Sequence, residues 1–593
     1  MGARREASGL GARGRRVDMV TVHVAEHLGG GTVGRLGQAA MAVLAAAGLL
    51  GIGWAAAPGQ AAGPKDEVVI GVSQEPDILV PGLGGNLAVS SEVIMALFVA
   101  GAFWTDELKL APVAAKEIPT LENGLWKLLP GGKMQVTWHL KPSKWSDGVP
   151  VDAQDYVFTH RAIMNDNVPI IDRVFEKHVE NLYAPAPDTI VVTYKDHFAY
   201  ANTDVIEWGP WPRHVLEKAY HDNPGGLDKL PFGSDPQATV GNGPYRLVSW
   251  QKGSSIVAEA NPYYTLDTPR VKRIVWRVVS DTNTLGANML SSAIDAISPI
   301  GITFTQGVQL DQQIAQRRLA QKVLFTPGLV WEHIDLNLNN PKFKDKRVRQ
   351  ALLYALDRQA LVDALFGGKQ AVADSYLPPK HYAFDTSMPK YPHNPERAKQ
   401  LFAEAGWTPG PDGILRNAQG ERYTVSLGTT AGNRVREDVE QILQNQWRQV
   451  GVDLKIANQP ARVFFGETTR HRDFDMAMYA WVQKAFEDGE TLYTTDNIPS
   501  AQNAYNGQNF PGYSSAEMDR LLHAVPTELD QAKRAAMLKR AQALFADDLP
   551  VLPLYFRADV TVIKNGFQNW KPTGVGHNGQ VTWNASRWAW GAQ

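Results

Sequence analysis

Three short patterns in this 593-residue sequence combine residue types that can do chemistry. The first is His23-Val24-Ala25-Glu26-His27, which has the H-x-x-E-H spacing of zinc peptidases in which two histidines hold the metal and the glutamate activates water. It lies before an apolar segment, residues 39–57, that has the composition of an export signal. A segment that is removed or left outside the fold cannot organise a metal site, so we expect no zinc centre here.

The second pattern is the G-x-G-x-x-G of residues 574–579, which could cradle a dinucleotide phosphate. A dinucleotide-binding loop follows a strand and opens a helix. Here the glycines follow Lys571-Pro572 and lead to Val581, in a sequence without helical character. The context that gives this pattern its chemistry is missing, and we expect no bound cofactor.

The third pattern is the adjacent pair Glu487 and Asp488, which could be read as the two acids of a hydrolase. Neighbouring residues of a loop point apart, so solvated charge is the favoured interpretation. The sequence has no cysteine, which excludes disulfides, thiolate metal sites and a cysteine nucleophile. It also lacks a G-x-S-x-G elbow, and its histidines show no ligand spacing. We therefore expect no catalytic residue and no metal site.

The amino-terminal segment predicts export from the cytoplasm. Residues 39–57 are almost all Ala, Leu, Val, Ile and Gly, they follow Arg35, and the small residues Ala61 and Ala62 follow them. This order of basic, apolar and small residues predicts a secretory signal with cleavage near Ala61 or Ala62. The alternative is a membrane anchor, but Ala and Gly are poor anchors compared with Leu and Ile. Without a cysteine there is no lipid anchor, so a periplasmic protein is expected.

Length and composition predict a folded protein of several domains. A chain of 593 residues is too long for a single hydrophobic core, and 44% apolar with 20% charged residues is ordinary for a folded protein. The formal net charge of −2 shows no excess of basic residues. Nothing in this balance indicates a nucleic-acid partner.

The first half of the exported chain is predicted to be rich in strands. Short β-type runs separated by turns rich in Pro and Gly occur at residues 68–72, 135–140, 189–194, 255–258 and 273–279. Beyond Ile334 the pattern changes to helices that alternate with strands. The second half is therefore predicted to form an α/β lobe.

Individual helix signals support the α/β prediction. Apolar residues between Val348 and Leu361 follow helical spacing, and Asn394-Pro395 predicts a helix start that Gly406 closes. A second apolar stripe, residues 435–450, precedes a predicted strand at 452–456. Residues 549–555 are extended again. A chain that leaves one lobe near residue 335 and re-enters it near 552 crosses twice, as expected of a hinge.

Residues 145–160 are the most specific string in the sequence. Asp147-Gly148 favours a tight turn, Pro150 keeps the chain extended, and Asp152 can cap a helix that carries Val157. The string also resembles the signature of the bacterial extracellular solute-binding proteins of family 5, the oligopeptide- and dipeptide-binding components of ABC importers.

Four further segments resemble motifs of the same family, in the same order. They are the turn Gly241-Asn242-Gly243-Pro244-Tyr245, the segment Asn261-Pro262-Tyr263-Tyr264, the long run of residues 337–357 and the run of residues 397–407. Five blocks in the correct order make coincidence unconvincing as an explanation.

The resemblance implies an α/β fold of the bilobed periplasmic-binding-protein type, with an extra subdomain in the first lobe and a two-strand hinge. The lobes would close over a ligand. The boundaries that follow are 1–62 for the leader and signal, 63–105, 235–334 and 553–593 for the core of the first lobe, 106–234 for its extra subdomain, and 335–552 for the second lobe.

The resemblance also implies which segments meet the ligand. In the first lobe the family's ligand-backbone segment corresponds to Asn86, Leu87 and Ala88, and in the second lobe to Ala480-Trp481-Val482. An extended peptide could add as a strand to such backbone groups, a mode that depends little on side chains. Trp481 would stack on the ligand or line a pocket; the alternative is a structural tryptophan of the lobe.

One position departs from the family pattern. Peptide binders of this family place an Asp three residues after this tryptophan, where it pairs with the ligand's ammonium group. This chain has Lys484 there, and the nearest acids are Glu487 and Asp488. Either one of those acids supplies the charge, or the ligand lacks a free amino terminus.

The expected function is that of a monomeric binding protein that captures an oligopeptide or dipeptide and presents it to an inner-membrane ABC permease. One alternative keeps the fold but changes the solute to a sugar, a metal chelate or an anionic metabolite, which Lys484 favours. The other is an exported hydrolase acting on peptides or glycans.

Overall fold

The computed structural model describes residues 65–83, 87–170, 178–203, 209–486, 488–575 and 581–591. The chain divides into residues 1–62 and a compact unit of residues 63–593. The His23–His27 pattern and the expected signal segment lie outside the described residues, as do Asn86, Glu487 and most of the glycine pattern that begins at Gly574. In the part of the chain that is described, no helix has both the length and the apolar character needed to cross a bilayer.

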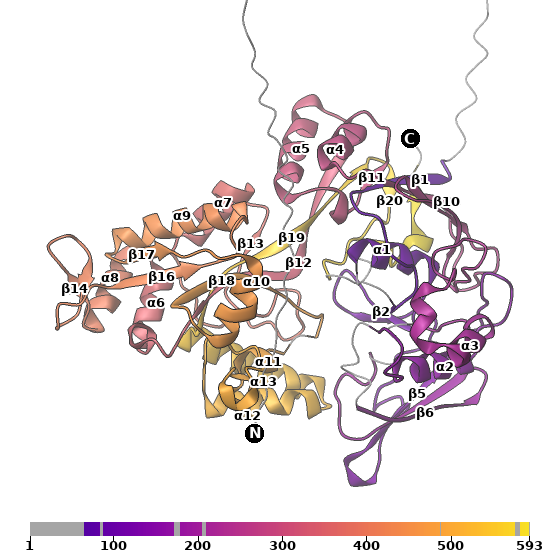
Figure 1. Ribbon diagram of the computed structural model, residues 1–593, viewed down its shortest axis with the longest axis horizontal. Coiled ribbons are helices and arrows are strands. Elements are labelled where there is room, and N and C mark those ends of the chain that lie inside the picture. Colours follow the sequence, from indigo (N-terminus) through magenta and orange to yellow (C-terminus); the bar gives the residue numbers. More distant parts are fainter. Residues whose placement is uncertain are drawn as a thin grey trace, which may run out of the picture. The chain divides into compact units, whose positions relative to one another are not determined.

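One large mixed sheet runs through the compact unit (Figure 1). In spatial order its strands are β17 (Asp453–Ile456), β16 (Thr424–Gly428), β18 (Met476–Val482), β12 (Gln321–Leu336), β19 (Val551–Lys564), β11 (Ala296–Ile297), β1 (Glu67–Val72), β10 (Arg273–Val278), β9 (Ser255–Ala260) and β8 (Tyr245–Gln251), with β13 (Ala371–Val372) paired to β19.

Two long antiparallel strands, β12 and β19, connect the two lobes. One half of the pair lies among β16, β17 and β18, and the other half continues into β11 and β1. The β12–β19 register shifts between Pro327 and Trp331, so the strands are irregular between the two halves. This arrangement confirms the expected mixed α/β fold of two lobes joined by two strands.

Helices cover both faces of the second-lobe sheet. Alternate β12 residues belong to different cores: Ile334 packs in one, and Trp331 packs in the other. The first core contains α6 (Lys346–Tyr354), α7 (Arg358–Phe366), α8 (Pro395–Glu404) and α9 (Arg434–Gln449), and the second contains α11 (Glu490–Tyr493), α12 (Ala516–Ala524) and α13 (Gln531–Asp548).

The apolar stripe from Val348 to Leu361 forms two helices rather than one. The carboxylate of Asp357 accepts a hydrogen bond from the backbone N–H of Ala360 at 2.8 Å, so this residue caps the start of α7. The helix predicted to start at Asn394 is confirmed, because Asn394 Oδ1 accepts the N–H of Arg397 at 3.0 Å.

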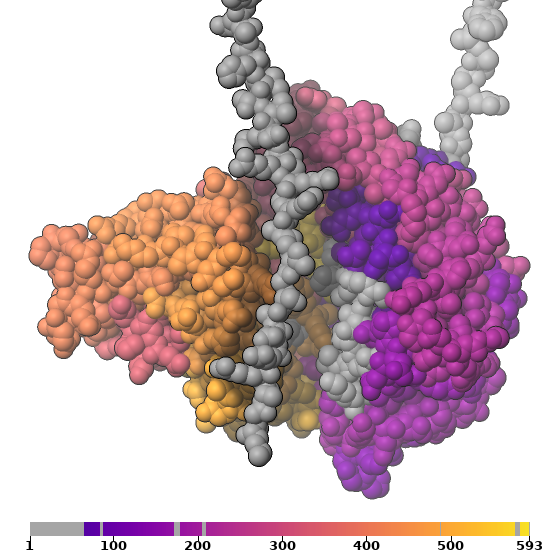
Figure 2. Space-filling view, viewed as in Figure 1, coloured from indigo at the N-terminus to yellow at the C-terminus, as the bar shows by residue number. Residues whose placement is uncertain are grey.

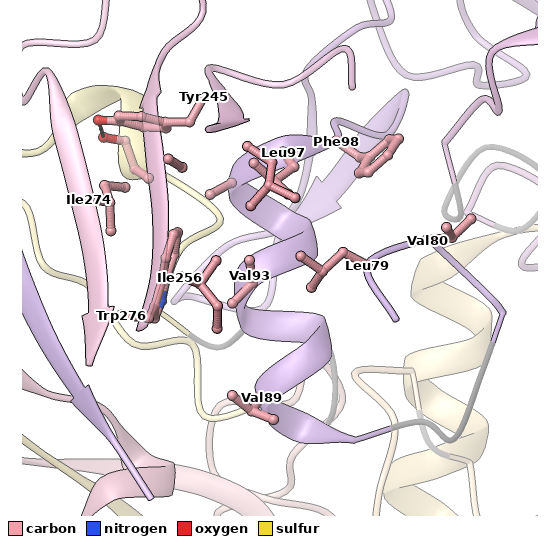
Figure 3. Packing of buried hydrophobic residues seen from close by; sticks show 14 of the residues in the cluster. Leu79, Val80, Val89, Val93, Leu97, Phe98, Tyr245, Ile256, Ile274 and Trp276 are labelled. Atoms are coloured by element: carbon pink, nitrogen blue, oxygen red, sulfur yellow. Dashed lines mark hydrogen bonds between the residues drawn. The ribbon is translucent and has the colours of Figure 1, made fainter. Parts of the chain in front are cut away.

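The first-lobe part of the sheet has α1 (Ala88–Leu97) on one side and α4 (Thr282–Leu290) and α5 (Phe304–Arg317) on the other. Figure 3 shows Val89, Val93 and Leu97 of α1 turned toward Ile256 and Trp276 of the sheet. This packing fixes the helix whose first residues are part of the predicted ligand segment.

A separate four-stranded sheet lies between β1 and β8 in the sequence. It consists of β4 (Trp126–Leu128), β5 (Met134–His139), β7 (Thr189–Tyr194) and β6 (Val179–Ala186). It has its own core, which includes residues of α2 (Ala153–Ile163); α3 (Arg213–Asp222) packs beside α2. The predicted start of α2 is confirmed, since Asp152 Oδ1 accepts the N–H of Gln154 at 2.8 Å.

The remaining described strands form short antiparallel pairs, and a short helix follows β17. They are β2 (Ala102–Trp104) with β3 (Leu110–Pro112), β14 (Thr408–Pro409) with β15 (Leu415–Arg416), β20 (Phe567–Gln568) with β21 (Ala589–Trp590), and α10 (Ala461–Val463). The five predicted early strands correspond to β1, β5, β7, β9 and β10. The predicted domain boundaries stay predictions.

Candidate functional site

The outer edge of β18 offers backbone groups to a ligand. The N–H of Gln483 donates to the carbonyl of Leu329 at 3.1 Å, and Trp481 lies opposite Trp331. In an antiparallel ladder, alternate residues direct their backbone N–H and carbonyl groups at the neighbouring strand. Trp481 and Gln483 therefore direct these groups at β12, and Ala480 and Val482 direct theirs away from it. On that second side β16 pairs only with Met476 and Ala477. Beyond Ala477 no strand among the described residues pairs with this edge, so an extended ligand could.

Trp481 lies in an aromatic wall beside that edge. Its ring stacks on Phe510 at a centroid distance of 6.0 Å and meets Tyr479 edge to face at 5.4 Å. Phe465 also contacts Tyr479, and 43% of its surface is exposed. Trp481 is itself only partly buried. The wall can therefore both stabilise the lobe and present aromatic surface to a ligand.

A buried polar network joins β18 to β12. The hydroxyl of Tyr479 donates to Asp335 Oδ2 at 2.5 Å, and His333 Nε2 lies 3.4 Å from the other oxygen of this carboxylate. Burial raises the pKa of the Tyr479 hydroxyl well above its ordinary value, so this group stays a hydrogen-bond donor. The network fixes the strand that carries Trp481.

The loop after β18 contacts the first lobe. The ring of Phe486 lies 4.6 Å from that of Tyr200 and 6.1 Å from that of Trp104. The hydroxyl of Tyr200 donates to Asp488 Oδ2 at 3.4 Å, and Asp488 Oδ1 accepts the N–H of Glu490 at 2.9 Å. Both oxygens of Asp488 thus have protein partners.

Lys484 belongs to the same loop and is exposed, with its ammonium group 5.8 Å from the centre of the Phe486 ring. Its positive charge remains where the family pattern has an acid. Glu487, the other acid of this loop, lies outside the described residues.

The first-lobe segment lies at the start of α1. Leu87 occupies the residue before the helix, has 37% of its surface exposed, and its carbonyl accepts the N–H of Ser91 at 3.1 Å. Ala88 is the first helical residue and is partly buried.

Figure 2 shows the described surface hollowed between residues coloured indigo to magenta and residues coloured orange. That Leu87, Ala88, Ala480, Trp481 and Val482 contact a ligand stays a prediction.

A cluster of charges on the connecting strands was not anticipated from the sequence. Glu332 on β12 is buried and accepts hydrogen bonds from Arg436 Nε at 3.2 Å and Nη2 at 3.3 Å, and a further one from Arg557 on β19. Burial alone raises the pKa of Glu332, but the charges of Arg557 and Arg436 outweigh it and hold this pKa below its usual range. The members lie more than 100 positions apart in the sequence, and no local pattern joins them.

Comparison with known proteins agrees with this geometry. The family model described as "Bacterial extracellular solute-binding proteins, family 5 Middle" matches residues 121–503, which is more than half of the chain. The oligopeptide-binding protein AppA of Bacillus subtilis is 26% identical over 471 residues, covering 78% of this chain and 82% of AppA. The glutathione-binding protein GsiB of Salmonella paratyphi A is 26% identical over 481 residues, covering 78% of this chain and 84% of GsiB.

Among solved structures, the oligopeptide-binding protein of Thermus thermophilus in complex with a pentapeptide is similar to this chain. The two share 32% sequence identity with a TM-score of 0.62, covering 89% of this chain and 97% of the other. The likeness therefore includes both lobes rather than a single motif.

Proposed function

Because this chain belongs to the bacterial extracellular solute-binding proteins of family 5, we propose that it captures oligopeptides or dipeptides between its lobes and delivers them to an ABC permease. The observation that carries the proposal is the open edge of β18 at Ala480 and Val482. Relatives whose names include oligopeptide and glutathione binding support the peptide as the solute.

The proposed mechanism uses main-chain hydrogen bonds and lobe closure. A peptide adds as a strand to β18, while Leu87 and Ala88 meet it from the first lobe and Trp481 packs against its side chains. The ligand touches both lobes only in the closed form, so binding shifts the population toward that form. The permease then recognises the closed form. Export through the signal at residues 39–57, with cleavage near Ala61 or Ala62, is part of this proposal.

Lys484 supports a second candidate within the same fold. A lysine in place of the family's acid disfavours a ligand ammonium group nearby and suits a solute with negative charge. An anionic metabolite is therefore the alternative to a peptide. No catalytic residue is part of either proposal.

We expect peptides to copurify with the chain of residues 63–593 and to be identifiable by mass spectrometry after acid release. A synthetic copy of the most abundant one, at a concentration about 100 times its Kd, should stabilise the protein by about 2.7 kcal/mol and raise its melting temperature. The peptide should be recovered intact after prolonged incubation.

Three outcomes would contradict the proposal. Copurification of a non-peptide anion with no response to peptides would favour the alternative solute. Cleaved peptide that accumulates with time would indicate the hydrolase. The absence of any thermal response to a diverse pool of peptides would exclude peptide capture.

A further inference from the structure

The loop after β18 leaves open which residue receives the ammonium group of a peptide. Lys484 carries the wrong charge for it. Asp488 already accepts the N–H of Glu490 and the hydroxyl of Tyr200. Glu487 lies outside the described residues, so the candidates for this interaction among the described residues are other carboxylates that lie near the connection between the lobes.

The connecting strand β19 carries a carboxylate on a definite face. Residues 559–562 pair regularly with residues 323–326 of β12, so side chains alternate between the faces there. Thr561 accepts a hydrogen bond from Trp570 Nε1 at 3.1 Å, and Trp570 belongs to the core that contains α1. Val560 and Val562 belong to the opposite core with α4 and α5. Asp559, two residues before Thr561, therefore lies on the α1 side.

The same face continues into the second lobe. Arg557 lies two residues before Asp559, and its guanidinium bonds to Glu332. Glu332 is the cross-strand partner of Ala480 on β18, so these two side chains share a face. The stripe from Asp559 through Arg557 to Glu332 thus joins the α1 side of the first lobe to the predicted ligand strand of the second.

Three residues in the middle of β19 are partly exposed, although most of the strand is buried. Arg557, Ala558 and Asp559 are partly exposed, while the residues on each side of them are buried. The Asp559 carboxylate has no hydrogen bond or ion pair in the described part of the chain, and its electrostatic partner there is Arg557, which bonds to Glu332. The buried Asp295 differs, since it bonds to Lys65, Lys564 and the N–H of Val69.

We propose that Asp559 binds the ammonium group of the peptide, as the specificity-determining residue for a free amino terminus. This inference rests on the proposed function. A partly exposed carboxylate that has no hydrogen-bond donor among the described residues suits an ammonium group, which brings three charged N–H donors.

Arg557 is a positioning residue in this arrangement. Burial raises the pKa of the Asp559 carboxyl to about 6, and the charge of Arg557 opposes that rise. At pH 7.5 Asp559 is therefore mostly ionised and can attract a cation. Because Arg557 is held by Glu332, it supports that charge without occupying the carboxylate.

The test uses the chain of residues 63–593, stripped of ligand by unfolding and refolding, at pH 7.5. The probe is a pool of synthetic pentapeptides, each present at equal concentration with a free and with an N-acetylated amino terminus. Captured peptides are quantified by mass spectrometry for the unmodified chain and for Asp559→Asn, Asp559→Glu and Asp488→Asn. Melting curves establish that each variant is folded.

The unmodified chain should enrich the free form by about ten-fold or more, because a charged partner is lost on acetylation. Asp559→Asn should abolish this preference and Asp559→Glu should retain part of it, with capture of acetylated peptides little changed. Equal loss of both forms in Asp559→Asn would indicate a structural role and overturn the inference. So would loss of the preference in Asp488→Asn but not in Asp559→Asn.

Failure of the inference differs from failure of the proposed function. Equal capture of free and acetylated peptides by the unmodified chain overturns only the role of Asp559. Capture of neither form overturns peptide binding itself, and ammonium recognition with it.

Discussion

At the scale of single residues, Glu92 is the most unusual group in the first-lobe core. It lies one turn into α1, is 2% exposed, and accepts a hydrogen bond from Trp276 Nε1 at 3.1 Å. Burial raises the pKa of its carboxyl to about 7, against a smaller lowering by its hydrogen bonds to Ser298 and Trp276. A carboxyl in this position is most stable in its neutral form.

Replacing Glu92 by Gln should remove a pH dependence of stability. The folded-state pKa lies above the unfolded value, so the folded protein binds more protons between pH 4.5 and 7, and stability falls as pH rises through that range. We expect the unmodified chain to lose about 3 kcal/mol from this group between pH 4 and pH 8, and Glu92→Gln to lose none of it.

Denaturant unfolding at pH 5 and pH 8 gives the change in the free energy of unfolding for each chain. The difference between the two changes is the contribution of Glu92. Other groups titrate in the same range, but they are common to both chains and cancel. Equal pH dependence in the two chains would show that Glu92 is ionised in the folded state.

Residues that act within a local motif could be predicted from the sequence, and residues that act across long separations could not. The caps at Asp152 and Asn394 follow from neighbours a few positions away. Glu332, Arg436 and Arg557 come together only because two strands, β12 and β19, and the helix α9 converge. The face of the sheet on which Asp559 lies could not be predicted either, because it is defined by the pairing of β19 with β12.

At the scale of elements, the Gly-Asn-Gly turn at residues 241–243 anchors the end of α1. The N–H of Gly243 donates to the carbonyl of Leu97 at 2.8 Å, and the side chain of Asn242 bonds to both the N–H and the carbonyl of Val99 at 3.0 Å. A Cβ on Gly243 would overlap the backbone of Leu97. Glycine is required at this position because two backbone segments approach closely.

Gly243→Ala should therefore lower stability by about 1–3 kcal/mol, since Leu97 or the turn must move. The matched control is Gly286→Ala in α4, where the new methyl would lie 3.8 Å from Leu310 Cδ1, an ordinary contact. The control should be neutral or more stable, because alanine favours a helix over glycine. Melting temperatures of the ligand-free chains test the pair, and equal shifts would contradict the steric argument.

Element types were predictable where one periodicity dominated. The five early strands and α9 appear where alternation or a helical stripe indicated them. The helical spacing from Val348 to Leu361 is confirmed, but it did not indicate the break at Asp357, because α6 and α7 both bury apolar residues in the same core and the pattern continues across the break.

At the scale of the whole compact unit, contacts besides β12 and β19 join the lobes. Phe486 packs on Tyr200 and Trp104, the N–H of Ala199 donates to the carbonyl of Pro526 at 2.7 Å, and Lys380 Nζ donates to the carbonyl of Asp106 at 3.0 Å. Phe486 follows the predicted ligand strand β18 by a few residues, so this loop links that strand to the contacts between the lobes.

Phe486→Ala should weaken ligand binding about five-fold by removing an aromatic contact worth about 1 kcal/mol from the closed form. The control is Tyr183→Ala, an aromatic side chain on β6 that is 42% exposed. Calorimetry gives the affinities, and small-angle scattering should show a more open ligand-free average for Phe486→Ala. Unchanged affinity with unchanged scattering would mean that these rings do not stabilise closure.

The two-lobed plan was predictable because the extended segments near residues 335 and 552 indicated two crossings between lobes. The contact of the loop at Phe486 with Tyr200 was not, since it depends on how two lobes meet rather than on either lobe's own pattern.

The position of β19 in the sheet has a consequence for biosynthesis. The first lobe needs a segment that is made late, because β19 pairs with β11 and because Trp570 and Trp588 belong to the first-lobe core. The ribosome has by then completed every strand of the second lobe other than β19. A nascent chain released before residue 551 would expose that core to proteases and chaperones. The core of the first lobe can be completed only after the ribosome has made the chain through Trp588, a delay that suits the proposed export in unfolded form.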